Sequence, residues 1–157
     1  MTDIKDPENT LFLDLESGRV TIELRPDLAP NHVARIKELA REGFYDGIVF
    51  HRVIEGFMAQ GGDPTGTGTS GSGKNLAAEF SSEPHTRGVC SMARSQNPDS
   101  ADSQFFICFG DASFLDGQYT VWGKVIDGMD FVDGIKRGEP VNDPDKIVKM
   151  SVAADAA

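Results

Sequence analysis

Cysteine and histidine, the residues that build disulfide frameworks and zinc sites, are scarce in this sequence, which has two cysteines and three histidines. Cys90 and Cys108 each lie in an apolar run typical of a strand, so we expect both thiols to be buried and reduced. His32, His51 and His85 are not spaced as metal ligands, and we expect structural or surface roles for them. The sequence therefore predicts no metal site and no cofactor.

Positive charge and long apolar runs are also in short supply. The chain has 15 Lys and Arg against 25 Asp and Glu, a net charge of -10. Nucleic acids and anionic membranes attract clustered Lys and Arg, so we expect neither as a partner. The first residues show no basic region followed by an apolar stretch, and no apolar run is long enough to span a bilayer. We therefore expect a cytoplasmic protein. The length suits a single domain over residues 1–157, and we expect a monomer.

Short strand patterns dominate what is present. Leu11, Leu13 and Leu15 alternate with other residues, and the same alternation resumes at Val20 after a turn that contains Gly18, which predicts a β-hairpin. Further strands are expected at Val49–Ile54, Phe57–Gly61, Gly88–Arg94, Gln104–Phe109, Thr120–Ile126 and Ile147–Val152. About eight short strands suit either a closed barrel or a sandwich.

Two amphipathic helices interrupt the strands. The first is predicted from Pro30, which fits the first helical position, to Glu42, just before Gly43. The second is predicted over Gly128–Arg137, with Asp127 as its N-cap. Both helices suit a position over the open ends of a barrel.

A glycine-rich stretch lies in the long segment 63–87, which lacks periodicity. Residues 66–71 match the dinucleotide pattern GxGxxG, and residues 68–74 match the start of a phosphate-binding loop. Both matches are weak, because Asn75 stands where the phosphate loop needs Ser or Thr and because no strand-to-helix context surrounds the glycines. We expect a flexible surface loop and keep nucleotide binding as a remote alternative.

Arg52 is the residue that most needs an explanation. It lies in the otherwise apolar run Val49–Ile54, where an unpaired charge is costly to bury. Met58 and Gln60 share one face of the following strand by alternation. These residues predict a cleft that is half apolar and half polar.

Two further segments carry apolar residues that the core alone does not explain. Gln104 and Phe106 share one face of a strand that is apolar on both sides, so the second face must be covered or form a pocket. The turn that contains Phe114, Leu115 and Tyr119 either lines a cleft or plugs a barrel end.

Four motifs in order, FHRVIEGFMAQGGD, SMAR, SQFFI and FLDGQYTVWGKV, resemble those of the cyclophilins, a family of peptidyl-prolyl cis-trans isomerases inhibited by cyclosporin. The resemblance covers nearly the whole chain. It implies a mainly β fold, an eight-stranded antiparallel closed β-barrel capped by two α-helices. It also implies that the chain accelerates rotation about X-Pro bonds and assists protein folding.

The resemblance assigns a role to each candidate site residue. It makes Arg52 the catalytic residue, and Phe57, Met58, Phe106 and Leu115 the pocket for the proline ring. It makes Gln60 and Gln104 the polar flanks of that pocket, and Ala93 and Arg94 the strand that aligns the peptide. Phe114 and Tyr119, also expected to bind substrate, stand where many members have Trp and His.

The implied partners are proline-containing peptides and unfolded or folding proteins, with cyclosporin bound at reduced affinity. Affinity for cyclosporin is expected to be reduced because Phe114 lacks the N–H donor of an indole. The alternative is a non-catalytic module that binds proline peptides, although a pure binder has little need of Arg52.

Overall fold

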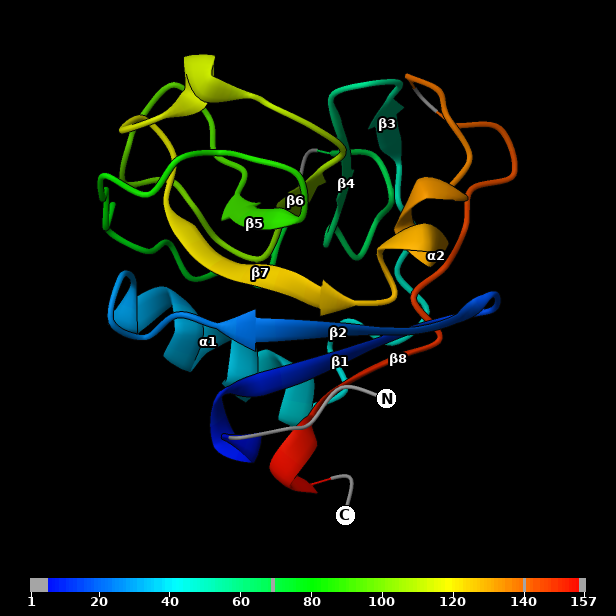
Figure 1. The fold of residues 1–157 in the computed structure, drawn as a ribbon, viewed down its shortest axis with the longest axis horizontal. Helices are drawn as coiled ribbons and strands as arrows, with labels where there is room; N and C mark the ends of the chain where they lie inside the picture. The colour runs from blue at the N-terminus through cyan, green and yellow to red at the C-terminus, as the bar shows by residue number, and fades with distance from the viewer. Residues whose placement is uncertain (1–5, 69, 140, 156–157) are drawn as a thin grey trace.

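The structure is a computed structural model that describes residues 6–68, 70–139 and 141–155. Its eight strands form one curled antiparallel sheet in the order β3-β4-β6-β5-β7-β2-β1-β8 (Figure 1). The strands are β1 (Thr10–Leu15), β2 (Gly18–Leu24), β3 (Arg52–Ile54), β4 (Met58–Gly61), β5 (Val89–Met92), β6 (Phe105–Cys108), β7 (Val121–Asp127) and β8 (Lys149–Val152). The helices are α1 (Pro30–Arg41), α2 (Met129–Asp133) and the 3₁₀ turns η1 (Pro7–Asn9), η2 (Ser113–Leu115) and η3 (Ala153–Asp155).

The predicted strands are present, most of them shorter than predicted. The hairpin is confirmed, because β1 pairs with β2 from Thr10 opposite Glu23 to Leu15 opposite Gly18. The prediction of a strand over Val49–Ile54 is wrong in its first half, since only the last three residues belong to β3. The residues before β3 instead make irregular bonds to the segment that leads into β8.

The predicted closure of the barrel is wrong as a continuous ladder. Among the described residues, the two end strands of the sheet, β3 and β8, share no strand pairing. Single backbone hydrogen bonds between residues 47–53 and 138–147 bridge the gap instead. They include Gly47 N to Ile147 O (2.7 Å), Phe50 N to Asp145 O (2.9 Å) and the reciprocal pair between Val53 and Gly138 (2.9 and 2.8 Å). The mainly β fold with eight antiparallel strands and two helices is confirmed.

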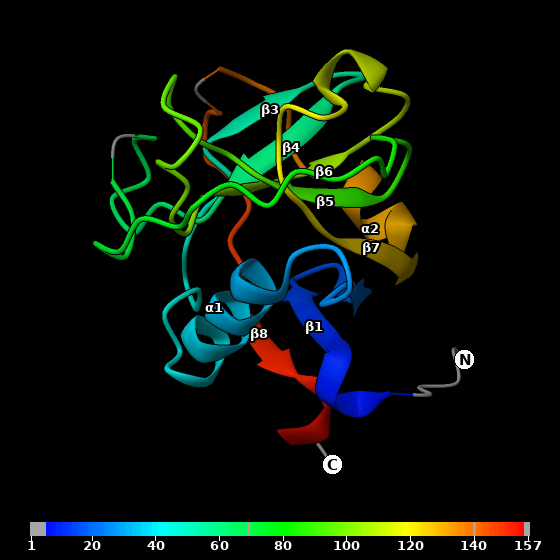
Figure 2. The same ribbon diagram turned by 90° about the vertical axis from the view of Figure 1, so that its left-hand side faces the viewer.

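Helix α1 agrees with its prediction to within one residue. It begins at Pro30, whose missing N–H costs nothing at a helix start, and Gly43 follows it with a φ of 74°. Its buried residues include Val33, Ile36 and Leu39, and the helix packs against β8 and β7, with β8 beside it in Figure 2. The helix therefore covers one opening of the curled sheet.

Helix α2 is much shorter than predicted. Asp127 is the last residue of β7 rather than a cap, and Gly128 takes the cap position with a φ of 83°. A side chain at Gly128 would lie 2.4 Å from the carbonyl oxygen of Arg19, so the close approach to β2 requires glycine. Gly134 ends the helix, and residues 135–139 run on as an irregular segment toward β3.

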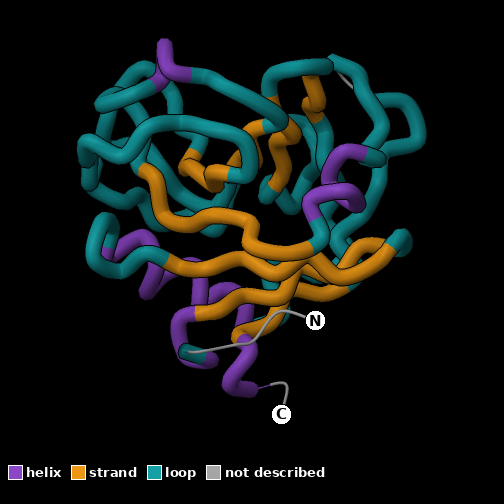
Figure 3. The backbone as a smooth tube through the Cα atoms, viewed as in Figure 1, coloured by secondary structure: helices purple, strands orange, loops and turns teal. Residues whose placement is uncertain are grey.

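The core has two parts, separated by the sheet. The larger part holds Trp122, Phe105 and Ile107, and the smaller one holds Phe106 and Cys108 together with Met58. Strand β6 contributes to both because successive side chains point to opposite faces. Loops make up most of the upper half of the molecule as Figure 3 shows it.

The two cysteines lie in the core of the protein. Cys90 and Cys108 are buried free thiols, as predicted, and burial raises the pKa of both, that of Cys108 to about 12.

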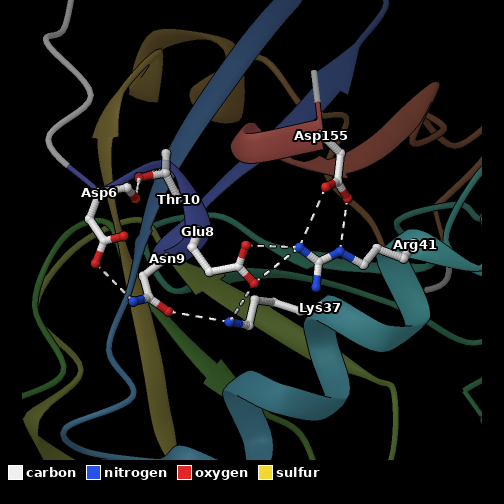
Figure 4. Close-up of polar contacts among 7 residues, drawn as sticks. All are labelled: Asp6, Glu8, Asn9, Thr10, Lys37, Arg41 and Asp155. Atoms are coloured by element: carbon white, nitrogen blue, oxygen red, sulfur yellow. Dashed lines mark hydrogen bonds and ion pairs between the residues drawn. The ribbon is translucent and has the colours of Figure 1, made fainter. Parts of the chain in front are cut away.

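Arg41, at the end of α1, bonds both Glu8 of η1 and Asp155 of η3, which ties these two 3₁₀ turns to the helix (Figure 4). Within the described ranges, no helix combines the length and the apolar character that crossing a bilayer requires.

Candidate active site

Three neighbouring strands place an arginine, a glutamine and a phenylalanine in one row across the sheet. Arg52 on β3 is opposite Gln60 on β4, and Gln60 is opposite Phe106 on β6. Directly opposed residues in an antiparallel sheet point to the same face. The row therefore sets a cation, an amide and an aromatic ring side by side on one surface.

A small pocket of about 130 Å³ lies along this row. Its apolar floor is made by Met58, Phe106 and Leu115, which are 1, 4 and 8% exposed. Arg52 and Gln60 supply its polar side. The remaining lining residues are Phe57, Ala93, Arg94 and Tyr119.

Aromatic contacts hold the walls of the pocket. The rings of Phe106 and Tyr119 meet edge to face with centroids 5.7 Å apart, and the Arg94 guanidinium lies 4.7 Å over the Tyr119 ring. At the mouth of the pocket, the ring of Phe57 contacts the ring of Phe114, with centroids 5.3 Å apart. Phe114 is 65% exposed, so it borders the pocket rather than lining it.

A buried histidine supports the floor from below. The ring of His85 stacks on Phe106 with centroids 6.2 Å apart. Its Nδ1 lies 3.0 Å from Asp116 Oδ1, and its Nε2 lies 3.0 Å from Ser91 Oγ. The backbone N–H of His85 also donates to Asp116, and this bond is the main reason why the pKa of that carboxyl is lowered. Of the two roles expected for the histidines, structural or surface, His85 has the structural one.

Arg52 is held at two of its three guanidinium nitrogens. Its Nε donates to Glu139 Oε2 at 3.1 Å, and its Nη1 donates to Gln60 Oε1 at 3.3 Å. No described residue provides an acceptor for Nη2. Arg52 therefore has an ion-pair partner in Glu139, and the same side chain lines the small pocket.

A chain of amide hydrogen bonds extends this arrangement. Gln60 Nε2 donates to Gln104 Oε1 at 3.0 Å, and Gln104 Nε2 donates to the carbonyl oxygens of Gly68 and Ser70 at 3.0 and 2.9 Å. The direction of each bond defines the orientation of both amides. The catalytic candidate Arg52 is thereby connected to the glycine-rich loop.

Asp63 organises that loop. Its carboxylate accepts hydrogen bonds from the backbone N–H groups of Thr65, Gly68 and Ser70 at 2.7, 2.6 and 3.2 Å. A phosphate would need such N–H groups, and here a carboxylate already holds them. The loop also leads to β5 rather than into a helix, so the dinucleotide pattern lacks its structural context.

A second, polar pocket of about 320 Å³ adjoins the first. The two pockets share Gln60, Ala93 and Arg94 as their common rim. Gln104 lines the second pocket only. A peptide whose proline lies in the small pocket would therefore place a neighbouring residue over this rim.

The structure brings nine of the eleven candidate residues together around the small pocket. The two others, Gln104 and Phe114, lie at its edge, in the adjoining pocket and at the mouth. His51, expected to point away from the cleft, is buried beside the glycine-rich loop, and burial lowers its pKa. In the described part of the chain, no group of three or more His, Cys, Asp or Glu is arranged to hold a metal.

Sequence reasoning missed two carboxylates that shape the site. Glu139 lies 87 residues from Arg52 in a segment without periodicity, and no local pattern indicates that the two meet. Asp63 could have been found, because an acid just before a Gly- and Thr-rich stretch is typical of side chains that accept from nearby backbone N–H groups.

Comparison with known proteins gives this geometry a context. The family model for cyclophilin type peptidyl-prolyl cis-trans isomerases matches residues 11–153. A probable peptidyl-prolyl cis-trans isomerase of Brucella suis is 57% identical, over 96% of this chain and 85% of that protein. Peptidyl-prolyl cis-trans isomerase B of Bacillus subtilis is 45% identical, over 82% of this chain and 90% of that protein.

Solved structures agree. Cyclophilin AquaCyp293 from Hirschia baltica has a TM-score of 0.89 at 32% identity, over 97% of this chain and 76% of that chain. A Cryptosporidium parvum cyclophilin, solved in the presence of the dipeptide Ala-Pro, has a TM-score of 0.84 at 30% identity, over 91% of this chain and 98% of that chain. Fold, family match and relatives point the same way, and the chain belongs to the cyclophilin-type peptidyl-prolyl cis-trans isomerase family.

Proposed function

We propose that the chain isomerises X-Pro bonds with Arg52 as its catalytic residue and with the small pocket as the grip on the proline ring. The observation that carries the proposal is the row of Arg52, Gln60 and Phe106, which sets a permanent cation beside an apolar floor. Membership of the family supports it.

The reaction explains why so few chemical groups are needed. An X-Pro bond has partial double-bond character, and the barrier to its rotation is about 18–20 kcal/mol. No bond is made or broken, so no nucleophile or acid–base pair takes part. The enzyme has to hold one side of the bond, let the other rotate and favour the twisted state.

Arg52 suits the last of these tasks. As the amide twists, its nitrogen becomes pyramidal and gains a lone pair that the planar ground state lacks. A guanidinium donor aimed at that nitrogen binds the twisted state better than the planar one. Arginine keeps its charge at every working pH, so the step needs no tuning of a pKa.

The required acceleration is moderate. A turnover on the order of 10³ s⁻¹ asks for a barrier about 7 kcal/mol lower than in water. One hydrogen bond from a charged donor supplies roughly 1.5–3 kcal/mol of this. The grip on the ring and the exclusion of water from the pocket supply the remainder.

Replacement of Arg52 tests the proposal. We expect Arg52→Ala to lower kcat/KM for a proline tetrapeptide by at least about 100-fold, because the charge that stabilises the twisted amide is lost. The side chain is 44% exposed, so the thermal midpoint should stay close to that of the wild type. Arg52→Lys is the matched control that keeps the charge without the planar fork, and it should retain part of the activity. A wild-type rate for Arg52→Ala would contradict the mechanism.

The rival function, a module that captures proline peptides without catalysis, predicts a different pair of results. Titration with the same peptide would then give binding, and the coupled assay would give no acceleration by the wild-type protein. The two measurements together separate an isomerase from a binder.

We further propose the substrates and setting that the sequence predicts. Proline-containing segments of unfolded or folding proteins are the substrates, and the Ala-Pro dipeptide named for the Cryptosporidium parvum cyclophilin supports this class. A monomer in the cytoplasm is the expected form. Cyclosporin is expected to bind with reduced affinity, because Phe114 offers no N–H donor.

A further inference from the structure

The segment that follows α2 runs alongside the strand that carries Arg52. Gly138 and Val53 exchange both backbone hydrogen bonds, at 2.8 and 2.9 Å, and Val141 N donates to His51 O at 3.2 Å. These bonds fix the segment on both sides of Glu139, against the two residues that flank Arg52. The backbone therefore places the Glu139 carboxylate next to the Arg52 guanidinium.

The contact between the two side chains is specific. Glu139 Oε2 accepts from Nε of Arg52 at 3.1 Å, while Gln60 Oε1 accepts from Nη1 at 3.3 Å. Nε and Nη1 are separate nitrogens of one rigid planar group, so two acceptors determine its orientation as well as its position. With one acceptor alone, the guanidinium plane could still rotate about the single hydrogen bond that is left.

The wild-type arrangement therefore limits the rotamers of a long side chain that is 44% exposed. Catalysis by this group depends on aim, because a small displacement of a positioned donor weakens its contact with the transition state. The negative charge of the carboxylate also partly neutralises the guanidinium, which weakens the stabilisation of the twisted amide. The two effects predict opposite changes in rate when the carboxylate is removed.

We infer that Glu139 is a positioning residue that, with Gln60, orients Arg52 and leaves Nη2 directed to the substrate. The inference rests on the proposed catalytic role of Arg52. It adds to the reaction a residue from a distant segment, held in place by the hydrogen bonds of Gly138 to Val53 and of Val141 to His51.

Glu139→Ala and Glu139→Gln test this role in the full-length chain, with a proline tetrapeptide as the probe. We expect Glu139→Ala to lower kcat about three- to fivefold, the scale of a lost exposed ion pair, with little change in KM. Glu139→Gln keeps an oxygen acceptor of the same reach, so it should restore most of the lost rate. A general structural weakening would not be rescued by the amide.

A double variant tests whether Glu139 acts through Arg52. In the Arg52→Ala background, the further change Glu139→Ala should have no effect, because the group that it orients is gone. An additional loss of rate in that background would overturn the inference. A wild-type rate for Arg52→Ala alone would instead contradict the proposed function, so the two failures are distinguishable.

Glu55 provides a matched control. It is an exposed glutamate that follows β3 and does not contact Arg52. Its carboxylate accepts a hydrogen bond from Nε of Arg137, in the segment after α2, at 2.7 Å. Glu55→Ala makes the same change in net charge and removes an anchor of the segment, and it should leave kcat unchanged. An equal loss in Glu55→Ala, or an unchanged or faster rate in Glu139→Ala, would overturn the inference.

Discussion

Asp63 is a buried carboxylate whose pKa reflects the loop that it holds. Burial alone would raise the pKa, but hydrogen bonds from the backbone and hydroxyl of Thr65 and from the N–H groups of Ser70 and Gly68 outweigh it and lower the pKa to about 2. The ordinary value is 3.8. The ionised form therefore stabilises the folded state at neutral pH, and protonation removes that contribution.

The expected consequence is a loss of stability in acid. Because the folded pKa lies below the unfolded one, the contribution is complete above about pH 5 and disappears as the pH falls toward 2, and it amounts to about 2 kcal/mol. Urea unfolding of the wild type and of Asp63→Asn at pH 7 and pH 3 measures it. The variant should be less stable at pH 7 and should lose less on acidification.

Asp127→Asn is the control for the loss of a carboxylate, because Asp127 is exposed at the end of β7. It should lose stability between pH 7 and pH 3 as the wild type does. If Asp63→Asn also shows the wild-type dependence on pH, the bonds from the loop do not stabilise the carboxylate in solution.

Individual residues differ in how far the sequence predicts them. Arg52 could be singled out because a charge inside an apolar run breaks a local rule, and Phe106 because its strand is apolar on both faces. Glu139 obeys every local rule for an exposed loop residue. Its contact with Arg52 depends on where Gly138 and Val141 bond to residues 51–53, and local patterns do not contain that information.

At the scale of elements, the turn η2 divides its side chains between the pocket and solvent. Leu115 is buried in the floor, whereas Phe114 is 65% exposed at the mouth and touches Phe57. A residue in this position can reach the outer part of a large ligand without changing the floor. We therefore expect that a change at Phe114 can alter the affinity for cyclosporin without altering the proposed grip on a proline ring.

Phe114→Trp tests this separation. The indole adds an N–H donor at the mouth, and one hydrogen bond to a ligand carbonyl is worth about 0.5–1.5 kcal/mol, so we expect cyclosporin to bind about three- to tenfold more tightly. Calorimetric titration measures the change. Phe131→Trp, at an exposed phenylalanine of α2 that lines neither pocket, is the matched control and should leave the Kd unchanged. An unchanged Kd for Phe114→Trp would show that the missing donor does not limit affinity.

The two helices show why some elements can be predicted and others cannot. The stripe of α1 and the proline at its start are local signals, and the helix forms where they indicate. The pattern Met129, Val132 and Ile135 is equally helical, yet α2 ends at Asp133. Gly134 weakens the helix at that point, and the chain beyond it bonds to residues 51–53 instead, a tertiary contact that overrides local propensity.

At the scale of the whole molecule, the sheet is closed by isolated bonds rather than by a ladder. Alternation in the sequence predicts where strands lie and which faces are apolar, but it does not say which edges meet. The eight strands were therefore predictable, whereas the meeting of residues 47–53 with 138–147 was not. That seam also carries Arg52 and Glu139, so an irregular part of the fold positions the proposed catalytic group.

Hydrogen exchange can show whether this seam is less stable than the ladders. Phe50 and Ile147 donate backbone hydrogen bonds across the seam, and both side chains are 0% exposed, as is Ile22 in β2. An isolated bond opens without breaking its neighbours, whereas a ladder bond opens only with adjacent pairs. We therefore expect the seam amides to exchange at least about tenfold faster than hydrogen-bonded amides of β1 and β2. Equal protection would mean that the molecule opens as one unit, with Arg52 held as firmly as the core.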